Sequence, residues 1–300
     1  MILRIEHRLR YQYSRPVFLE PFTLRMRPRS DCTQTLLHHS LEIDPAPRGR
    51  AEVVDLDGNS VATAWFEGTH PALSLRAFSE VRTLRTHPFD FLITDEAFLR
   101  VPVPGHKTPP APLAPYLLRE NADPAVETFA RARAEEVDGE TLRFLSHLAE
   151  RMQVEFEREH RAEGPARPPS RVLADRRGAC RDLTVLYLDA CRALGLPARF
   201  TTGYWFPEGG EEPPELHAWA EVYLPGGGWR GFDPSAGLAV ADQYVALASG
   251  PDPDSAALTT GTFRGTGVQS QLTWDLDLEV LESAGSSEDL SGSGTPGSGL

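Results

Sequence analysis

The hydrophobic pattern of this chain first changes its period across a proline-rich stretch, and that change constrains the fold most. Before the stretch, "LRIEHRLRYQYS" and "ALSLRAFSEVRTL" mix polar–apolar alternation with β-branched and aromatic residues, which is typical of strands. After it, "DGETLRFLSHLAERM" repeats apolar residues every three or four positions, which indicates a helix. The sequence therefore predicts an α+β protein whose first domain is all-β.

Turn and composition signals set the expected boundaries. "VVDLDGNSVATAWF" places an Asp-Gly-Asn turn between two apolar runs, and no helical periodicity precedes about residue 95, so we expect a β-sandwich. Prolines in "VPVPGHKTPPAPLAPYL" predict a linker or surface strap, and the final Ser/Gly-rich residues predict disorder. The expected segments are a β-rich domain at 1–95, a linker or strap at 96–121, a second domain at 122–282 and a tail at 283–300.

Charge and cysteine content exclude several classes of protein. A net charge of −13 argues against general binding to nucleic acid or to a membrane surface. No stretch approaches the roughly 20 apolar residues of a membrane span, and "MILRIEHRLRYQY" lacks the apolar run of a signal peptide. The three cysteines are sparse and contain no CxxC pair, which argues against a disulfide scaffold or structural zinc. A cytoplasmic protein is the expectation.

One cysteine stands where a helix is expected to begin. Cys180 follows a Gly-Ala pair and precedes a long amphipathic segment that ends at a Gly-Leu-Pro stop signal. The positive end of the helix dipole favours a thiolate there, and Arg176, Arg177 and Arg181 are close in sequence. Cys191 falls on the apolar face, roughly 16 Å along the same helix, too far for a disulfide with Cys180. We therefore expect Cys191 to be a core residue.

Two later stretches supply the partners that a nucleophilic thiol needs. "LHAWAEVYL" and "GWRGFDPS" read as a hairpin around Pro-Gly-Gly-Gly, and they carry His217 and Asp233. Taken singly, a core cysteine, a strand histidine and a turn aspartate are ordinary structural residues. Together they supply a nucleophile, a general base and a group that orients the base, while the helix start supplies N–H donors for an oxyanion.

The alternation of side chains along a strand sets a geometric condition for a Cys180–His217–Asp233 triad. His217 and Trp219 share one face of their strand because side chains alternate. A four-residue connection at 225–228 would point Asp233 away from His217. The triad therefore requires an odd-length connection or a bulge, such as a three-residue loop at 225–227 that sets Asp233 opposite Trp219.

These motifs also resemble a known family. "GACRDLTVLYLDACRALGLPARFTTGYW", followed by "HAWAEVYLPGGGWRGFDPS", is similar to the core of the bacterial transglutaminase-like proteins, which are papain-fold thiol enzymes, and the β-rich region resembles their N-terminal domain. The resemblance implies a papain-like catalytic domain with Cys180 as nucleophile, His217 as base and Asp233 as orienting acid. It also implies acyl transfer at a peptide or protein amide, without metal or organic cofactor. Arg181 departs from the pattern, since many members have glutamine there.

Rival interpretations remain at this level. The fold could serve as a catalytically silent binding or scaffold module, or Cys180, His217 and Asp233 could be three zinc ligands. His38-His39 with Cys32 matches no metal-ligand spacing. If the chain is an enzyme, hydrolysis is favoured over transamidation because water is abundant and nothing in the sequence indicates a site that excludes it.

Aromatic and acidic residues near the triad have two interpretations each. Trp205, Trp219 and Trp229 could line a substrate cleft, although aromatic strand residues more often pack a core. The acidic loop at 208–215 could attract basic substrates or act as a lid, although a solvated loop is the simpler interpretation. Neither the substrate nor the oligomeric state follows from the sequence.

Overall fold

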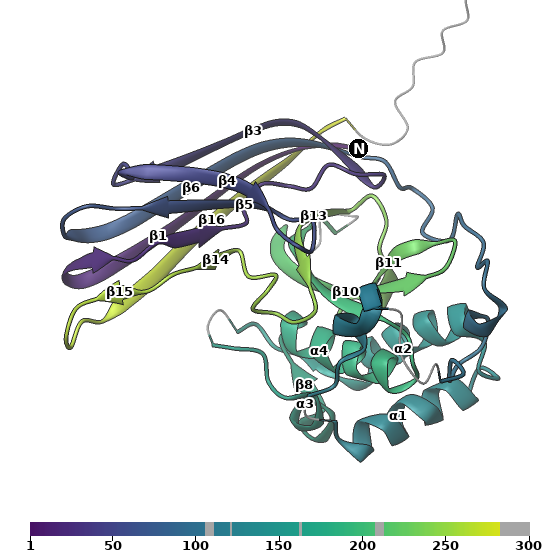
Figure 1. Ribbon diagram of the computed structural model, residues 1–300. Helices are drawn as coiled ribbons and strands as arrows, with labels where there is room; N and C mark the ends of the chain where they lie inside the picture. The colour runs from purple at the N-terminus through teal and green to yellow at the C-terminus, as the bar shows by residue number, and fades with distance from the viewer. Residues whose placement is uncertain (106–110, 121, 162–163, 208–212, 283–300) are drawn as a thin grey trace, which may run out of the picture.

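The computed structural model describes residues 1–105, 111–120, 122–161, 164–207 and 213–282. Long strands extend to one side of the molecule, and the helices gather on the other (Figure 1). The predicted α+β class, with a strand-rich N-terminal region followed by a mixed domain, is confirmed. The tail at 283–300, for which disorder was predicted, lies outside the described residues.

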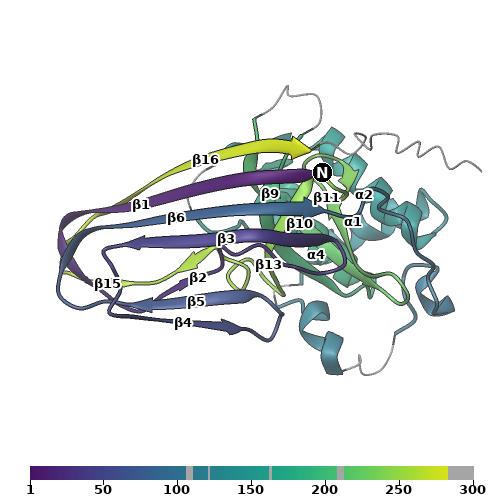
Figure 2. The ribbon, with the colours of Figure 1, turned by 90° about the horizontal axis from the view of Figure 1, so that it is seen from above.

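The first domain consists of two antiparallel sheets. The larger sheet has the order β15–β1–β6–β3, and β16 also pairs with β1. Figure 2 shows β16, β1, β6 and β3 side by side. The smaller sheet has the order β14–β2–β5–β4. The strands of both sheets are β1 (Ile2–Leu19), β2 (Phe22–Leu24), β3 (Gln34–Asp44), β4 (Gly49–Val54), β5 (Ser60–Trp65), β6 (His70–Thr83), β14 (Thr259–Thr260), β15 (Phe263–Arg264) and β16 (Ser270–Glu282).

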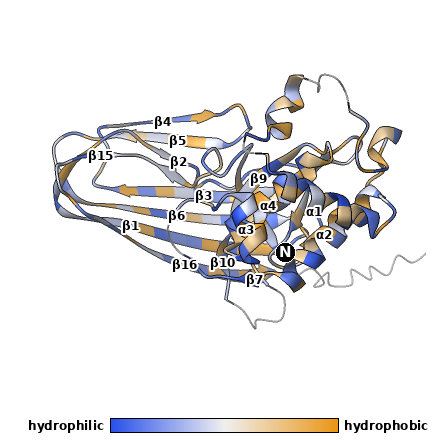
Figure 3. Ribbon diagram, turned by 90° about the horizontal axis from the view of Figure 1, so that it is seen from below, coloured by the Kyte–Doolittle hydropathy of each residue, from blue (hydrophilic) through white to orange (hydrophobic). Residues whose placement is uncertain are grey.

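Alternation along the strands builds the core of this sandwich. Every second residue of β6 from Leu73 to Val81 is buried. Hydrophilic and hydrophobic residues alternate along β1 and β6 in Figure 3. The buried faces of both sheets meet in one cluster that includes Leu9, Val17 and Phe22. The period-2 pattern thus sets which face of each strand the domain buries.

The structure corrects the predicted boundary of the second domain. The segment 122–282 was expected to be one domain, but its last strands return to the sheets of the first. β16 pairs antiparallel with β1 from Leu3↔Val280 to Tyr13↔Ser270, and β14 pairs with β2. Alternation in "LTWDLDLEV" indicates a strand but carries no information about its partner, because this pairing joins opposite ends of the chain.

The second domain packs helices against a five-stranded sheet of order β12–β11–β10–β9–β13. Its central helix, α4, packs against β10, and the helices lie together on one side of the sheet (Figure 1). The strands are β9 (Ala198–Trp205), β10 (Glu215–Leu224), β11 (Gly228–Asp233), β12 (Leu238–Ala239) and β13 (Tyr244–Gly250), with a separate parallel pair of β7 (Glu157–Arg158) and β8 (Arg177–Gly178). The helices are α1 (Pro124–Glu135), α2 (Thr141–Glu155), α3 (Pro169–Asp175) and α4 (Cys180–Ala193).

The described part of the proline-rich segment lies along the second domain as a strap. It contains the 3-10 helices η1 (Glu96–Phe98) and η2 (Ala111–Leu117). Val101 and Val103 are buried, and their N–H groups donate to Gly139 (2.8 Å) and Leu194 (2.8 Å). Residues 106–110 lie outside the described part. None of the described helices is both long and apolar enough to cross a bilayer.

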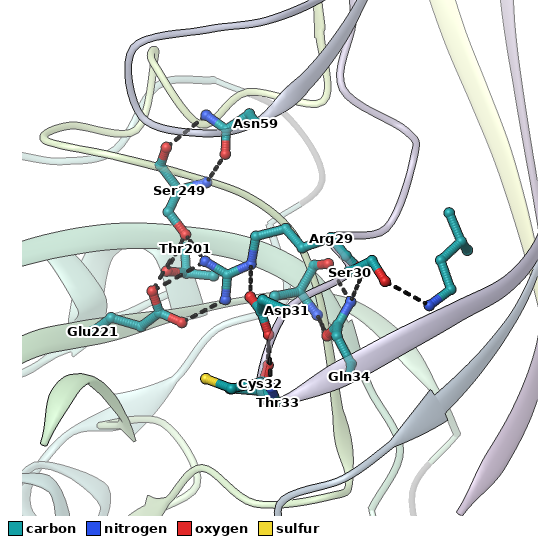
Figure 4. Close-up of polar contacts among 12 residues, drawn as sticks. Arg29, Ser30, Asp31, Cys32, Thr33, Gln34, Asn59, Thr201, Glu221 and Ser249 are labelled. Atoms are coloured by element: carbon teal, nitrogen blue, oxygen red, sulfur yellow. Dashed lines mark hydrogen bonds and ion pairs between the residues drawn. The ribbon is translucent and has the colours of Figure 1, made fainter.

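A buried ionic contact joins the two domains (Figure 4). Arg29, between β2 and β3, donates to Glu221 of β10 (2.7 Å) and to Ser249 of β13 (2.8 Å). Arg199 of β9 donates to the other oxygen of Glu221 (2.8 Å). Burial opposes ionisation of Glu221, but the charges of Arg29 and Arg199 hold its pKa well below its usual range. The first domain thus supplies half of the charge that a buried carboxylate of the second requires.

Two amides of the first domain extend this contact. Gln34 accepts from the Ala246 N–H (2.8 Å) and donates to its carbonyl (3.0 Å). Asn59 forms the same two bonds with Ser249, both of 2.8 Å. Side-chain amides therefore satisfy backbone groups of β13 as a neighbouring strand would. The domains form one packed unit.

Replacing Arg29 with alanine is expected to lower the free energy of unfolding by about 3–5 kcal/mol, because a buried carboxylate then loses one of two partners. The folded-state pKa of Glu221 is lowered, so its contribution is present above the unfolded-state pKa and disappears as pH falls. Urea unfolding should show a large difference from wild type at pH 7 and a smaller one in acid. Arg48→Ala, which breaks the exposed Arg48–Glu67 pair, should change little. Equal losses in both variants would contradict the prediction.

Candidate active site

Cys180 is the first residue of α4, as predicted, and a buried carboxylate fixes this helix start. Asp182 accepts from the N–H of Ala179 (2.9 Å), the N–H of Arg167 (2.8 Å) and the guanidinium of Arg161 (2.6 Å). Burial opposes its ionisation, but the hydrogen bonds from Arg161 and the backbone lower the pKa of Asp182. Ala179 has no side-chain acceptor, so Asp182 alone caps the helix. Sequence reasoning missed it, although an acid at the third helical position is a capping signal.

One of the three nearby arginines lies at the thiol. Arg181 lines the same cavity as Cys180. Arg176 and Arg177 instead form ion pairs with glutamates of other segments, at 3.0 and 3.3 Å. The sequence placed all three near the cysteine, but their side chains leave the helix start in different directions. The electrostatic contribution predicted from this cluster therefore rests on Arg181 and the helix dipole.

The β10–β11 hairpin has the register that the triad requires. Leu224 pairs with Gly228, so three residues form the connection, and the ladder continues to Ala220↔Phe232. One step further, Asp233 is opposite Trp219 and on the same face as His217. Gly228 has a φ of +66°, which glycine adopts without the strain of a Cβ atom. The odd-length connection predicted from strand parity is confirmed.

Asp233 binds His217 inside the protein. The Nε2 atom of His217 lies 2.7 Å from Oδ2 of Asp233, and Tyr244 donates its hydroxyl to the same oxygen (2.9 Å). Ser235 donates both its hydroxyl (2.7 Å) and its N–H (2.8 Å) to Oδ1. Burial opposes ionisation of Asp233, but the His217 charge and these hydrogen bonds lower the pKa of Asp233 to about 2. Asp233 is therefore a permanent anion that orients the imidazole.

The charge of Cys180 acts on the same imidazole, although Nδ1 of His217 has no hydrogen-bond partner among the described residues. Because Nε2 is bound to Asp233, Nδ1 is the ring nitrogen left for the thiol. Thr184 of α4 donates to the carbonyl of Ala218 (3.2 Å), which ties the helix of the thiol to the strand of the histidine. Burial disfavours the charged ring, but the charges of Asp233 and Cys180 raise the pKa of His217 well above its usual value. His217 is buried and Cys180 is half-buried, so the thiol is the accessible member.

A second carboxylate, which sequence reasoning did not single out, lies at the imidazole. Oε1 of Glu215 is 2.6 Å from Nδ1 of His217, in an ion-pair contact without the alignment of a hydrogen bond. Glu215 also pairs with Arg158 of β7. Burial opposes its ionisation, but the contact with His217 lowers the pKa of Glu215. Glu215 closes the acidic segment discussed above, of which residues 208–212 lie outside the described part.

The three tryptophans pack rather than line the cavity of the thiol. The Trp205 ring lies 5.0 Å from that of His217 and stacks on Tyr244, and Trp219 meets Tyr244 edge-on at 5.2 Å. Trp229 lies under the Arg199 guanidinium, 4.3 Å from it. Trp205 and Trp219 thus form an aromatic wall around the imidazole, and the core interpretation holds.

Neither the possible zinc site at Cys180, His217 and Asp233 nor the group around Cys32 and His39 forms a set of metal ligands among the described residues. Nowhere in this part of the chain do three His, Cys, Asp or Glu side chains group as metal ligands. At the triad, His217 and Asp233 bind each other instead of converging on a common point. Near Cys32, which is exposed, His39 uses its Nδ1 atom to contact Ser79 (2.9 Å).

Two family models match this chain. Residues 3–82 match the bacterial transglutaminase-like N-terminal region, and residues 127–234 match the transglutaminase-like superfamily. The second match spans α1 to the end of β11 and so contains Cys180, His217 and Asp233. The resemblance inferred from the quoted motifs is confirmed.

Two mycobacterial relatives match most of the chain. An uncharacterized protein of Mycobacterium leprae is 25% identical over 300 residues, covering 93% of this chain and 97% of the relative. An uncharacterized protein of Mycobacterium tuberculosis is 28% identical over 271 residues, covering 83% of each. The similarity therefore extends across both domains.

A solved structure shares the architecture. The crystal structure of a proposed cysteine protease from Cytophaga hutchinsonii has a TM-score of 0.68 and 22% sequence identity. It covers 94% of this chain and 91% of the other. This likeness confirms the fold, with a strand-rich N-terminal region and a papain-like, transglutaminase-type domain.

Proposed function

We propose that this chain, whose core belongs to the transglutaminase-like superfamily, catalyses thiol-dependent acyl transfer at amide bonds through Cys180, His217 and Asp233. The observation that carries the proposal is a half-buried thiol at a helix N-terminus whose charge acts on an imidazole, the Nε2 atom of which lies 2.7 Å from a buried carboxylate. Each part has a chemical role in acyl transfer: nucleophile, proton carrier and orienting anion.

The first half of the reaction forms a thioester. The Cys180 thiolate attacks the carbonyl carbon of the amide, and the C–N bond breaks. The departing amine takes a proton from the His217 imidazolium, which leaves the ring neutral. The Asp182 and Leu183 N–H groups donate to the Ala179 carbonyl, which leaves the N–H groups of Cys180 and Arg181, ahead of the first helical hydrogen bonds, as donors for the oxyanion that forms during attack.

The second half releases the acyl group. Neutral His217 takes a proton from the incoming nucleophile, which attacks the thioester, and the C–S bond breaks to restore the thiolate–imidazolium pair. Water gives a carboxylic acid, and a primary amine gives a new amide. We favour water because Cys180 is open to solvent on one side and water is the abundant nucleophile.

A peptide library tests this function. The purified protein is incubated with peptides, with and without a primary amine, and the products are read by mass spectrometry. Cleaved peptides would indicate hydrolysis, and products extended by the amine would indicate transamidation. A Cys180→Ala sample reports contaminating activity. Equal product from both samples would contradict the proposal.

One contact favours the alternative of a catalytically silent binding or scaffold module. Glu215 lies 2.6 Å from Nδ1 of His217, the same ring nitrogen that the thiol requires. A carboxylate held there competes with Cys180 for the imidazolium proton. Titration of Cys180 with a thiol-reactive acyl donor, followed by measurement of turnover, separates a silent module from an enzyme.

Replacing Glu215 with glutamine is expected to shift the alkaline limb of the activity profile. A carboxylate beside an imidazolium favours the protonated ring, so its removal lowers the pKa of His217. Activity should then decline at a pH lower by about 0.5–1 unit. Glu159→Gln is the matched control, because Glu159 lines the same cavity but pairs with Arg167 (2.8 Å). If kcat/KM profiles of both variants coincide with wild type, Glu215 does not influence the imidazole.

A further inference from the structure

The cavity that holds the Cys180 thiol has walls from both domains. Its volume is about 310 Å³, near the lower end for small-molecule sites. The second domain contributes polar and charged groups, whereas β1 and β16 of the first domain contribute mainly apolar ones. The first-domain residues of this lining are His7, Leu9, Leu272 and Trp274.

Strand register explains why these side chains point toward the thiol. Leu9 pairs with Trp274 across the β1–β16 ladder, so both lie on one face. Earlier on the same face, Leu3 and Ile5 pack into a cluster with residues of the second domain. Further along, Tyr13 packs into the sandwich core. The side chains on this face of β1 therefore pack first at the domain interface, then line the cavity, and finally pack in the sandwich core.

Trp274 differs from its neighbours on this face. It is 54% exposed, whereas Leu9, directly opposite, is 6% exposed. A large aromatic side chain thus stands half uncovered at the mouth of the cavity, where burial against a ligand is available. The area that it offers is apolar.

Several charged groups of the same cavity are already paired within the protein. Arg158 pairs with Glu215, Arg161 with Asp182 (2.6 Å), and Glu159 with Arg167 (2.8 Å). A charged substrate group would have to compete with these partners, whereas an apolar group would cover Trp274 and Leu9 without breaking an ion pair.

His7 is a buried, neutral member of this lining. Its Nδ1 atom contacts the hydroxyl of Tyr204 (3.1 Å), and its buried Nε2 atom has no hydrogen-bond partner among the described residues. Burial lowers the pKa of His7 to about 4, so the ring is uncharged at neutral pH. The ring is fully buried, so His7 forms part of the cavity lining without offering a hydrogen bond to a ligand.

We propose that the β1–β16 strand pair of the first domain is the specificity wall of the thiol site, and that it selects an amide substrate with a large apolar side chain beside the attacked carbonyl. This inference rests on the proposed function. The acyl part stays attached to Cys180 while the amine leaves, so a cavity around the thiol serves the acyl part. Leu9, Leu272 and Trp274 contact that side chain.

Affinity labels on the acyl side test the wall. Rates of alkylation at Cys180 are measured by mass spectrometry for N-acetyl-phenylalanine and N-acetyl-glycine chloromethyl ketones, with iodoacetamide as a probe of the thiol alone. In wild type, the phenylalanine label should react at least about tenfold faster than the glycine label. Trp274→Ala should lower this ratio about fivefold and leave the iodoacetamide rate unchanged, and Trp274→Phe should restore most of it.

Trp65→Ala is the matched control, because Trp65 is 41% exposed in the first domain and does not line the cavity. Its label ratio should equal that of wild type. A ratio near one in wild type, or one unaffected by Trp274→Ala, overturns the wall while the thiol chemistry stands. If iodoacetamide reacts no faster at Cys180 than at the exposed Cys32, both the wall and the proposed function fail.

Discussion

Replacing Cys180 with alanine is expected to lower amide turnover by at least about 10⁴-fold, to background, because no covalent path remains. His217→Ala should be almost as damaging, since the leaving amine then lacks its proton donor. The double variant should be no worse than either single one, because residues that act as one unit are not additive. The measurement is kcat/KM on any amide substrate from the peptide library.

Cys32→Ala is the control for this series, because Cys32 is exposed and belongs to the first domain. It should keep wild-type activity. Substantial activity in Cys180→Ala that a chelator abolishes would replace the thiol mechanism with a metal-dependent one.

Asp233→Asn belongs to the same series, and the structure changes what we expect of it. Asparagine still accepts from an imidazole, which by itself predicts a mild loss. However, Oδ1 accepts from the Ser235 N–H (2.8 Å), a group that can only donate, so the new amide nitrogen must face His217. Nε2 then becomes an acceptor and the ring proton moves to Nδ1, which prevents a neutral His217 from acting as base. We expect a loss of about 10³-fold, smaller than for Cys180→Ala.

Alkylation of Cys180 at mildly acidic pH is the second large effect. The pKa of His217 is raised well above its usual value, so the imidazolium is present at pH 6, and its positive charge favours nucleophilic attack by the Cys180 sulfur. Iodoacetamide should therefore label Cys180 at least about tenfold faster than Cys32 at pH 6. Cys191, which is fully buried, should react only after unfolding.

The charge of His217 determines how the labelling advantage of Cys180 changes with pH. Because its folded-state pKa is raised, the imidazolium is fully present at low pH and is lost as pH rises through that value. The advantage of Cys180 over Cys32 should shrink at alkaline pH, where the imidazolium is lost. In His217→Ala the two cysteines should react at similar rates at pH 6. Equal rates in wild type would remove the basis for a nucleophile.

Local patterns were sufficient to place most of the elements and to bring Cys180, His217 and Asp233 forward as candidates. The helix that starts at Cys180 follows from a Gly-Ala break before an amphipathic run, and burial in β6 follows its alternation. The facing of Asp233 and His217 follows from strand parity once the loop has three residues. These features depend on neighbours within about twenty residues, and the sequence records such neighbours directly.

The remaining site residues required the tertiary structure. Tyr244 and Ser235 bind Asp233, and Glu215 contacts His217, yet none belongs to a spacing motif that marks its role. Their contacts depend on where β13 and the turn after β11 lie relative to β10. A side chain's partners follow from packing in three dimensions, which periodicity does not encode.

The sequence by itself determined the fold class, the helix start at Cys180 and the hairpin that carries His217 and Asp233. Only the tertiary structure decided that β16 returns to β1, that Arg29 pairs with Glu221, and that Trp274 lines the same cavity as the thiol. The physical reason is contact distance along the chain: local elements arise from propensity and periodicity, whereas pairing between distant segments depends on which buried faces and charges complete one another in the folded state.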